Sequence, residues 1–205
     1  MELAVATTNS GKLAEIEAFL KDLPVRIVLL VSFDSWPKII EDGKTFEENA
    51  LKKARALADF PGHLTLADDS GLEVDALDGA PGVLSARYSG EGGDDVRNNE
   101  KLLSALAGVP WEKRGARFVC VLALVSPISC GRREWLFSGE CEGRIALSPR
   151  GENGFGYDPL FFYPPLGNTF AELERATKGE VSHRGRALKK LAQALPSLFP
   201  LTENP

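Results

Sequence analysis

The chain has 205 residues, of which 43% are hydrophobic, and its 24 basic and 29 acidic side chains give a net charge of -5. This length and apolar content suffice for one substantial core, so we expect a single domain over residues 1–205. An acidic chain offers no general electrostatic attraction for a polyanionic duplex, which argues against nucleic acid as a partner. No apolar stretch approaches the ~20 residues of a spanning helix, and we expect a cytoplasmic protein that does not bind a membrane.

The first sixty residues predict two strands and two helices. An apolar run at 3–6 predicts a buried strand, and apolar residues at helical spacing predict a helix over 12–20. A second strand is expected over 25–31. The next helix has a capping-box pattern, because Thr45 precedes Glu48 by three residues, and it should run to about residue 60.

Two adjacent aspartates, Asp68 and Asp69, follow a short apolar run over 64–67 and precede a Ser-Gly pair. The pattern predicts a strand that ends in a turn at 70–71, followed by a second, half-exposed strand over 72–77. Adjacent side chains on a strand point to opposite faces, so one carboxylate can face a cleft while the other anchors the turn. Taken alone, the pair is more typical of a hydrophilic turn than of a Mg²⁺ site, although one or two carboxylates plus substrate phosphates commonly hold Mg²⁺.

The rest of the chain continues to alternate helices and strands. A helix is expected over 98–106, two long strands over 117–125 and 133–141, and a final amphipathic helix over 184–195, followed by a flexible, frayed tail. The first of these strands is almost continuously apolar, which is typical of a central strand. Since the two strands are close in sequence, they predict an antiparallel pair within a mixed sheet, and the class is α/β. Three cysteines without a C-x-x-C spacing predict neither a disulfide framework nor a zinc site.

A polar loop links the first strand to the first helix and is a candidate anion site. Its residues are Thr7, Thr8, Asn9, Ser10, Gly11 and Lys12. Backbone N–H groups, the positive end of a helix and a lysine together favour a bound phosphate. The loop lacks the Walker A pattern, and a lysine after a turn is more often simply solvated.

Two later segments are candidates for recognising a base. Glycines surround Phe155 and Tyr157, whose rings could stack on a planar base, although aromatic residues more often belong to the core. Further along, Lys178, His183 and Arg184 could offer hydrogen bonds to a base edge or charge to a phosphate. For this basic cluster the alternative is a solvated helix end.

Six short motifs occur in order between about residues 6 and 190. They are Ala6-Thr7-Thr8-Asn9-Ser10-Gly11-Lys12, Thr45-Phe46-Glu47-Glu48-Asn49-Ala50, Ala67-Asp68-Asp69-Ser70-Gly71, Ser85-Ala86-Arg87-Tyr88, Gly154-Phe155-Gly156-Tyr157-Asp158-Pro159 and Ser182-His183-Arg184-Gly185. Together they closely resemble the inosine triphosphatase family, also called the Ham1 or dITP/XTP pyrophosphatase family.

The resemblance implies Mg²⁺-dependent hydrolysis of non-standard purine nucleoside triphosphates such as ITP, dITP and XTP to the monophosphate and pyrophosphate. It also implies an elongated mixed sheet flanked by helices, two lobes with a central substrate cleft, and a homodimer. By resemblance, Asp69 is the proton acceptor and a metal-linked carboxylate, and Glu41 is the second acidic metal ligand. The phosphate-side contacts fall in the loop 7–12, and the substrate pocket comprises Ser70, Phe155, Gly156, Tyr157, Asp158, Lys178, His183 and Arg184.

The chain departs from the family pattern at two positions. Thr8 stands where many members have glycine, which would alter the loop dihedrals, and Ile40-Glu41 stands where many have two consecutive glutamates, which leaves Glu41 as the only candidate there. Two rival functions remain, a Maf-type nucleotide pyrophosphatase with a different base preference and a nucleotide sensor without turnover. The segments around Tyr157 and His183 argue against the first rival. Retention of the aspartate pair and Lys12 argues against the second.

These assignments give an expected mechanism. Asp69 orients or deprotonates a water that attacks the α-phosphorus, while Lys12 and Lys178 spread the developing charge. Donors from His183, Arg184 or the loop backbone would bind the O6 acceptor of hypoxanthine or xanthine and leave the amino group of adenine unpaired. Asp68 is left as a supporting carboxylate with unspecified contacts.

Overall fold

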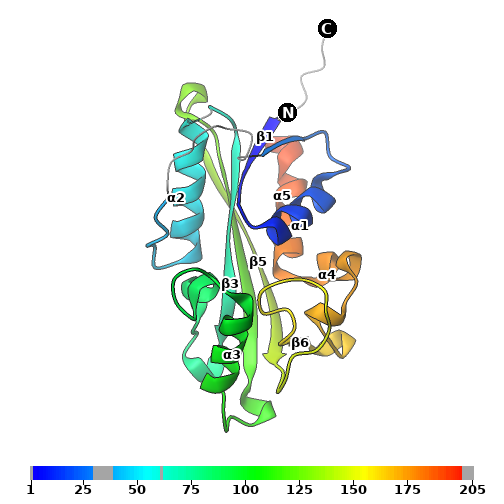
Figure 1. The fold of residues 1–205 in the computed structure, drawn as a ribbon. Coiled ribbons are helices and arrows are strands. Elements are labelled where there is room, and N and C mark those ends of the chain that lie inside the picture. The colour runs from blue at the N-terminus through cyan, green and yellow to red at the C-terminus, as the bar shows by residue number, and fades with distance from the viewer. Residues whose placement is uncertain (1, 30–38, 61, 200–205) are drawn as a thin grey trace.

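A computed structural model describes residues 2–29, 39–60 and 62–199. Within these residues, seven strands form one long, twisted mixed sheet with helices on both faces, so the expected α/β class is confirmed (Figure 1). The strands are β1 (Glu2–Ala6), β2 (Arg26–Leu29), β3 (Thr65–Val74), β4 (Gly115–Val125), β5 (Glu134–Ile145), β6 (Phe161–Tyr163) and β7 (Asn168–Thr169). The α-helices are α1 (Ser10–Leu20), α2 (Phe46–Asp59), α3 (Asp95–Ala105), α4 (Arg175–Val181) and α5 (His183–Leu198).

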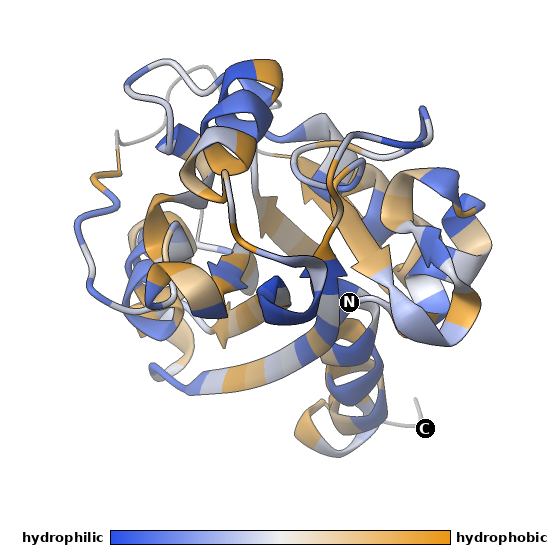
Figure 2. Cartoon of the chain, turned by 90° about the horizontal axis from the view of Figure 1, so that it is seen from below, coloured by the Kyte–Doolittle hydropathy of each residue, from blue (hydrophilic) through white to orange (hydrophobic). Residues whose placement is uncertain are grey.

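The strand order is β2-β1-β3-β4-β5-β6-β7. The neighbours β2, β1 and β3 run parallel, whereas each later pair is antiparallel, as the short connection between β4 and β5 predicts. Figure 2 shows hydrophobic strands in the centre of the molecule, between helices that mix hydrophobic and hydrophilic residues. In the part of the chain that the structure describes, no helix is long and apolar enough to span a membrane.

The strand that carries the two aspartates is longer than expected. β3 continues without a break from Thr65 to Val74, so the expected turn at 70–71 is wrong. Every residue of β3 pairs with a residue of β4, and this ladder overrides the local turn preference of the Ser-Gly pair. Gly71 serves a close approach instead, since a Cβ there would lie 2.5 Å from the carbonyl oxygen of Gly82. The strand expected over 72–77 is likewise corrected, because Asp75–Leu77 forms a turn of 3₁₀ helix.

The two faces of the sheet carry different helices. On one face, α2 packs its apolar side against alternate residues of the two central strands, including Ala67 and Val121. On the other face, α1 and α5 pack against the intervening residues, including Leu66 and Leu122. β4 is therefore buried on both sides, as its apolar sequence predicts. Because side chains alternate along β3, Asp68 belongs to the α1 and α5 face and Asp69 to the α2 face.

The cap of α2 and the bounds of three other helices differ from expectation, and α1 begins two residues early, at Ser10. In α2 the Thr45 hydroxyl caps the helix by accepting from the Glu48 N–H, as predicted, but the Glu48 carboxylate accepts from the N–H of Lys44 and not from that of Thr45. α3 begins three residues early because Asp94 caps it through the Arg97 N–H. α5 continues to Leu198, so the expected fraying after residue 195 is wrong over 196–198. Residues 30–31 of the second expected strand and the tail over 200–205 lie outside the described residues.

Candidate functional site

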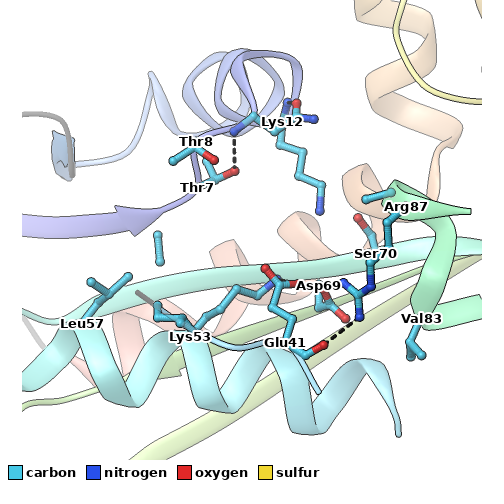
Figure 3. A pocket seen from close by; sticks show the side chains of 14 residues that line it. Thr7, Thr8, Lys12, Glu41, Lys53, Leu57, Asp69, Ser70, Val83 and Arg87 are labelled. Carbon is cyan, nitrogen blue, oxygen red and sulfur yellow. Dashed lines mark hydrogen bonds and ion pairs between the residues drawn. The ribbon is translucent and has the colours of Figure 1, made fainter. Parts of the chain in front are cut away.

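Two adjoining cavities form a cleft beside β3. The larger one, called here the Asp69 cavity, has a volume of about 650 Å³ and includes side chains from the loop 7–12, from α2 and from the segment after β3 (Figure 3). The smaller one, called here the Phe155 cavity, has a volume of about 260 Å³ and includes the glycine-rich loop and the start of α5. Four residues line both cavities, namely Asn9, Lys12, Ser70 and Ala86. A ligand with two unlike ends can therefore occupy both at once.

In the Asp69 cavity, one lysine joins the two predicted acidic ligands. Lys53, on α2, donates from Nζ to Asp69 Oδ1 at 2.7 Å and to Glu41 Oε2 at 3.2 Å. The second oxygen of Asp69, Oδ2, is buried and has no hydrogen-bond partner among the described residues. An unpartnered buried carboxylate oxygen is costly to a fold, which makes it a candidate for a ligand or a water proton.

Burial raises the pKa of Asp69 above its ordinary value of 3.8, against the charge and hydrogen bond of Lys53, and the nearby Glu41 carboxylate adds to the rise. For Lys53, burial alone would lower the pKa, but the carboxylates of Asp69 and Glu41 raise it, so the ammonium stays charged. The site thus holds a carboxylate with raised proton affinity beside a fixed positive charge. This combination suits a group that accepts a proton during a reaction.

The opposite face of β3 shows a saturated carboxylate. Oδ1 of Asp68 accepts from Lys12 Nζ and, at 2.9 Å, from Ser70 Oγ. Oδ2 accepts from Arg184 Nε at 2.9 Å and from Cys120 Sγ at 3.1 Å. Burial alone would raise the pKa of Asp68, but the charges of Arg184 and Lys12 hold it well below 3.8. Asp68 therefore positions these two cations and is not available to a substrate.

The Phe155 cavity contains an aromatic ring beneath two cations. Lys178 Nζ lies 4.7 Å and Arg184 Cζ lies 5.7 Å from the centre of the Phe155 ring. Lys178 is also bound to the carboxylates of Asp158 and Glu15, and Asp158 Oδ2 accepts from the Phe155 N–H at 2.9 Å. These bonds hold the glycine-rich loop so that the ring lines the cavity.

His183 is 4% exposed and stacks on Phe118 with ring centres 4.6 Å apart. Its burial, together with the charges of Arg184 and Lys178, places its pKa well below 6.5, so the imidazole is neutral. Tyr157 also lines this cavity, but its hydroxyl donates to the Ser85 carbonyl at 2.8 Å and its ring belongs to the core. Of the two aromatic rings considered for base stacking, only Phe155 lacks such a core anchor.

The structure brings most of the predicted residues to the cleft. Those that line one or both cavities are Thr7, Thr8, Asn9, Lys12, Glu41, Asp69, Ser70, Phe155, Gly156, Tyr157, Asp158, Lys178, His183 and Arg184. Ser10 and Gly11 line neither. Gly11 packs against Phe155, because a Cβ there would lie 2.4 Å from Cδ1 of that ring. Gly11 thus acts through close packing, and Ser10 begins α1.

The sequence reasoning missed three charged residues, namely Lys53, Arg87 and Glu15. The signal for Lys53 was available, since it falls on the inward face of α2 with Ala50 and Leu57, where a charge needs a partner. Arg87 stood within a quoted motif but received no role, and in the structure it lines the Asp69 cavity. Glu15 faces Lys178 and Arg184 across about 160 residues of sequence, which no local pattern reveals.

In the described residues, no group of three or more His, Cys, Asp or Glu side chains gathers as a ready-made metal site. The two carboxylates that share Lys53 still fit a hard cation, because Mg²⁺ needs only one or two carboxylates when phosphates and water supply its other ligands. The unpartnered Oδ2 of Asp69 is the oxygen that such an ion would use.

Comparison with known proteins gives a consistent result. The model of the Ham1 family matches residues 3–194. A protein named dITP/XTP pyrophosphatase from Geobacter sulfurreducens is 58% identical over 94% of this chain and 96% of its own length. A protein of the same name from Desulforamulus reducens is 51% identical to this chain, over 97% of this chain and 98% of its own length. The solved structure of a HAM1 protein from Coxiella burnetii aligns with a TM-score of 0.87 and 44% identity, over 96% of this chain and 99% of that one.

Proposed function

Because this chain belongs to the Ham1 family, as its six motifs predict, we propose that it is a dITP/XTP pyrophosphatase. In this reaction a non-standard purine nucleoside triphosphate is hydrolysed to the monophosphate and pyrophosphate. One observation carries the proposal: Asp69, whose buried Oδ2 has no hydrogen-bond partner in the described part of the chain, lines a cavity together with two lysines, beside a second cavity lined by aromatic rings. A triphosphate chain and a planar base match these two cavities.

The nucleotide then lies with its base in the Phe155 cavity and its phosphates in the Asp69 cavity. The α-phosphate falls where the cavities meet, beside Lys12 and Ser70, because it stands between base and outer phosphates. Lys12 is held at this junction by Asp68, and the Asn9 side chain fixes the start of α1 by accepting from the Lys12 N–H at 2.9 Å. The loop thus presents charge and N–H groups to the phosphates without reorganising on binding.

Asp69 and Glu41 would hold the Mg²⁺ of this reaction. When bound, such an ion neutralises phosphate charge and lowers the pKa of a coordinated water. The residues of the chain do the remaining work. Lys53 keeps the two carboxylates together, and its charge limits the rise in the pKa of Asp69.

In the chemical step, water oxygen forms a bond to the α-phosphorus, and the bond from that phosphorus to the bridging oxygen breaks. The bridging oxygen leaves with the β- and γ-phosphates as pyrophosphate, and the proton of the water passes to the Asp69 carboxylate, which lines the cavity. No oxidant, reductant or covalent intermediate is needed.

Base selection rests on neutral His183 and on the donors of Arg184. Three N–H groups of Arg184 are already engaged, by Asp68, Glu15 and Ser70, so its guanidinium is fixed in the Phe155 cavity. A fixed donor suits the O6 acceptor of hypoxanthine or xanthine, whereas the amino group of adenine would be left unpaired. Such a loss costs about 1 to 3 kcal/mol, roughly five- to a hundredfold in binding.

The test is an assay of the purified protein with ITP, dITP, XTP, GTP, ATP and UTP in the presence of Mg²⁺, with the phosphate product identified. We expect pyrophosphate, and the highest kcat/KM with ITP, dITP or XTP. Release of orthophosphate, or equal rates with ATP, would contradict the proposal, and a preference for UTP would favour the Maf-type alternative. A nucleotide-induced rise in Tm without any product would favour the sensor.

The proposal also includes a cytoplasmic location and assembly as a homodimer, of which the homodimer rests on the family resemblance. Sedimentation equilibrium of the purified chain tests the assembly. A single species of twice the 22.2 kDa chain mass is expected.

A further inference from the structure

Three cations line the Asp69 cavity, and their partners differ. Lys12 is paired with Asp68, and Lys53 is paired with Asp69 and Glu41. Arg87 is the last residue of the 3₁₀ segment Gly82–Arg87, and its side chain lines the same cavity (Figure 3). Among the described residues, no ion pair joins Arg87 to a carboxylate. Its Nη2 instead donates to the backbone carbonyl of Glu41 at 2.7 Å.

A carbonyl bond leaves the net charge of a guanidinium in place. Lys12 and Lys53 are in direct ion pairs with carboxylates, whereas the Arg87 guanidinium donates its hydrogen bond to a neutral carbonyl group. A guanidinium has five N–H donors in a planar fork, and the bond to Glu41 uses one of them. Arg87 therefore has both the charge and the donors to bind phosphate oxygens with two parallel hydrogen bonds.

The position of Arg87 indicates which phosphates it can reach. The residues at the junction of the two cavities include Lys12 and Ser70, but Arg87 lines the Asp69 cavity alone. With the base in the Phe155 cavity and the α-phosphate at the junction, the space beyond belongs to the two outer phosphates. These two phosphates leave together when the α-phosphorus is attacked.

We propose that Arg87 binds the β- and γ-phosphates of the substrate and therefore the departing pyrophosphate. This inference rests on the function proposed above. It assigns to Arg87 a contact with the leaving group, where its charge compensates the negative charge that develops on the bridging oxygen as the bond to the α-phosphorus breaks. Its bond to Glu41 also links the bound pyrophosphate to the loop that carries a metal-ligand candidate.

The experiment compares inhibition by the two products. Arg87→Met, Arg87→Lys and wild type are assayed with ITP at saturating Mg²⁺, and inhibition constants are measured for inorganic pyrophosphate and for IMP. The matched control is Arg97→Met, because the Arg97 side chain is 76% exposed and lines neither cavity. Thermal unfolding of each variant shows whether it is folded.

For Arg87→Met we expect the inhibition constant of pyrophosphate to rise about ten- to a hundredfold, as for loss of charge-assisted hydrogen bonds. The constant for IMP should stay within about twofold of wild type, because IMP occupies the other end of the cleft. Arg87→Lys keeps the positive charge but loses the planar set of N–H donors, so its inhibition constant for pyrophosphate should lie between those of wild type and Arg87→Met. The control should match wild type with both products.

Two results would overturn the inference. The first is an unchanged inhibition constant for pyrophosphate in a folded Arg87→Met variant. The second is an equal loss for pyrophosphate and IMP, which is the mark of a residue that only supports the cleft. If Arg87→Met does not fold, the same comparison is made with Arg87→Lys. Failure of the proposed function can be told apart from failure of this inference, because the wild-type protein would then release no pyrophosphate from ITP.

Discussion

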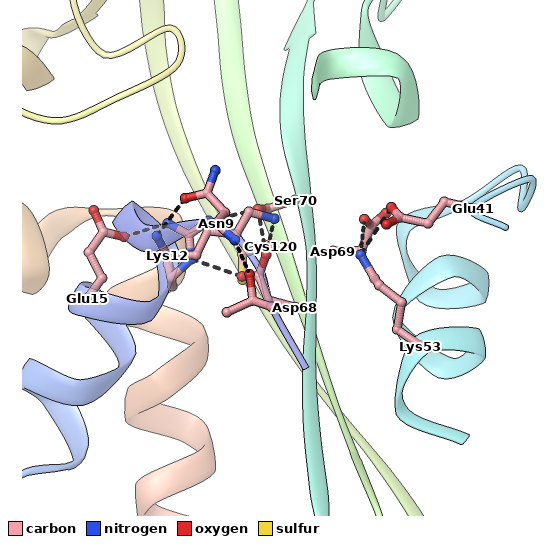
Figure 4. Close-up of polar contacts among 11 residues, drawn as sticks. Asn9, Lys12, Glu15, Glu41, Lys53, Asp68, Asp69, Ser70 and Cys120 are labelled. Atoms are coloured by element: carbon pink, nitrogen blue, oxygen red, sulfur yellow. Dashed lines mark hydrogen bonds and ion pairs between the residues drawn. The ribbon is translucent and has the colours of Figure 1, made fainter. Parts of the chain in front are cut away.

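Asp68 and Asp69 are neighbours in sequence and on one strand, yet their surroundings are opposite (Figure 4). Asp68 accepts from four donors on the α1 and α5 face. Asp69 shares one lysine with Glu41 on the α2 face, and its Oδ2 has no hydrogen-bond partner within residues 2–29, 39–60 and 62–199. The pKa of Asp68 is held well below 3.8 and that of Asp69 is raised above it. The saturated carboxylate organises the cleft, and the incomplete one is left to react.

The largest effect is expected from a substitution of Asp69, the reactive member of the pair. Asp69→Asn should lower kcat for ITP by about 10²- to 10⁴-fold, because it removes the proton acceptor. Folding raises the pKa of Asp69, so its ionised form adds no stability of its own at neutral pH. The variant also leaves the buried Lys53 ammonium with only its longer bond to Glu41, so its unfolding free energy should fall, but by less than that of Asp68→Asn. Product assays and urea unfolding measure the two effects. The control is Asp42→Asn, a nearby carboxylate whose side chain is 65% exposed. Near-normal kcat in Asp69→Asn would mean that another group accepts the proton.

The Asp68→Asn substitution tests the organising role of the other aspartate. Removing this carboxylate leaves Arg184 and Lys12 without their shared partner, and breaking a buried charge network costs about 3 to 5 kcal/mol. The loss should lie near the lower limit, because Arg184 keeps Glu15 and Lys12 is 17% exposed. Urea unfolding at neutral pH measures the effect. A loss below about 1 kcal/mol would show that Asp68 is not the organising group that its contacts indicate.

The depressed pKa of Asp68 gives this difference a pH dependence. A carboxyl with a lower pKa in the folded state stabilises the fold above its unfolded pKa, near 3.8, and loses that contribution as pH falls toward its folded pKa. The gap in unfolding free energy between wild type and Asp68→Asn should therefore be constant between about pH 7 and pH 5 and should narrow below about pH 3.8. Urea titrations across this range measure it. Narrowing that begins above pH 5 would contradict the depressed pKa.

The sequence could predict the α/β class, the first strands and helices, and most of the cleft residues. It predicted a turn within β3 because a Ser-Gly pair has local turn preference, whereas ten residues of pairing with β4 decide the outcome. The partition between Asp68 and Asp69 follows from strand alternation, but their partners do not. Arg184 lies 116 residues from Asp68, and only the packing of α5 on the sheet brings them together. Lys53 is buried on α2 among apolar residues, and the apolar spacing that predicts this helix gives a lysine no role.

The smallest expected effect concerns the fourth bond to Asp68. Cys120 is fully buried and donates from Sγ to Asp68 Oδ2 at 3.1 Å. Cys120→Ala should lower the unfolding free energy by more than its matched control, Cys141→Ala, which removes the same atom from another fully buried cysteine whose Sγ makes a longer contact, 3.9 Å to the Glu142 carbonyl. The difference between the two variants should be about 0.5 to 1.5 kcal/mol, the net contribution of one hydrogen bond. Urea unfolding measures it, and kcat for ITP should not change.

Cys120→Ser should recover most of this difference, because a hydroxyl can donate to the same carboxylate oxygen. If Cys120→Ala lowers the unfolding free energy no more than Cys141→Ala does, the Cys120 thiol only fills space, and the other three donors suffice to hold Asp68. If it also lowers kcat, the position of Asp68 is transmitted through Lys12 or Arg184 to the substrate. The two faces of β3 would then be coupled, and the division of labour between the two aspartates would be incomplete.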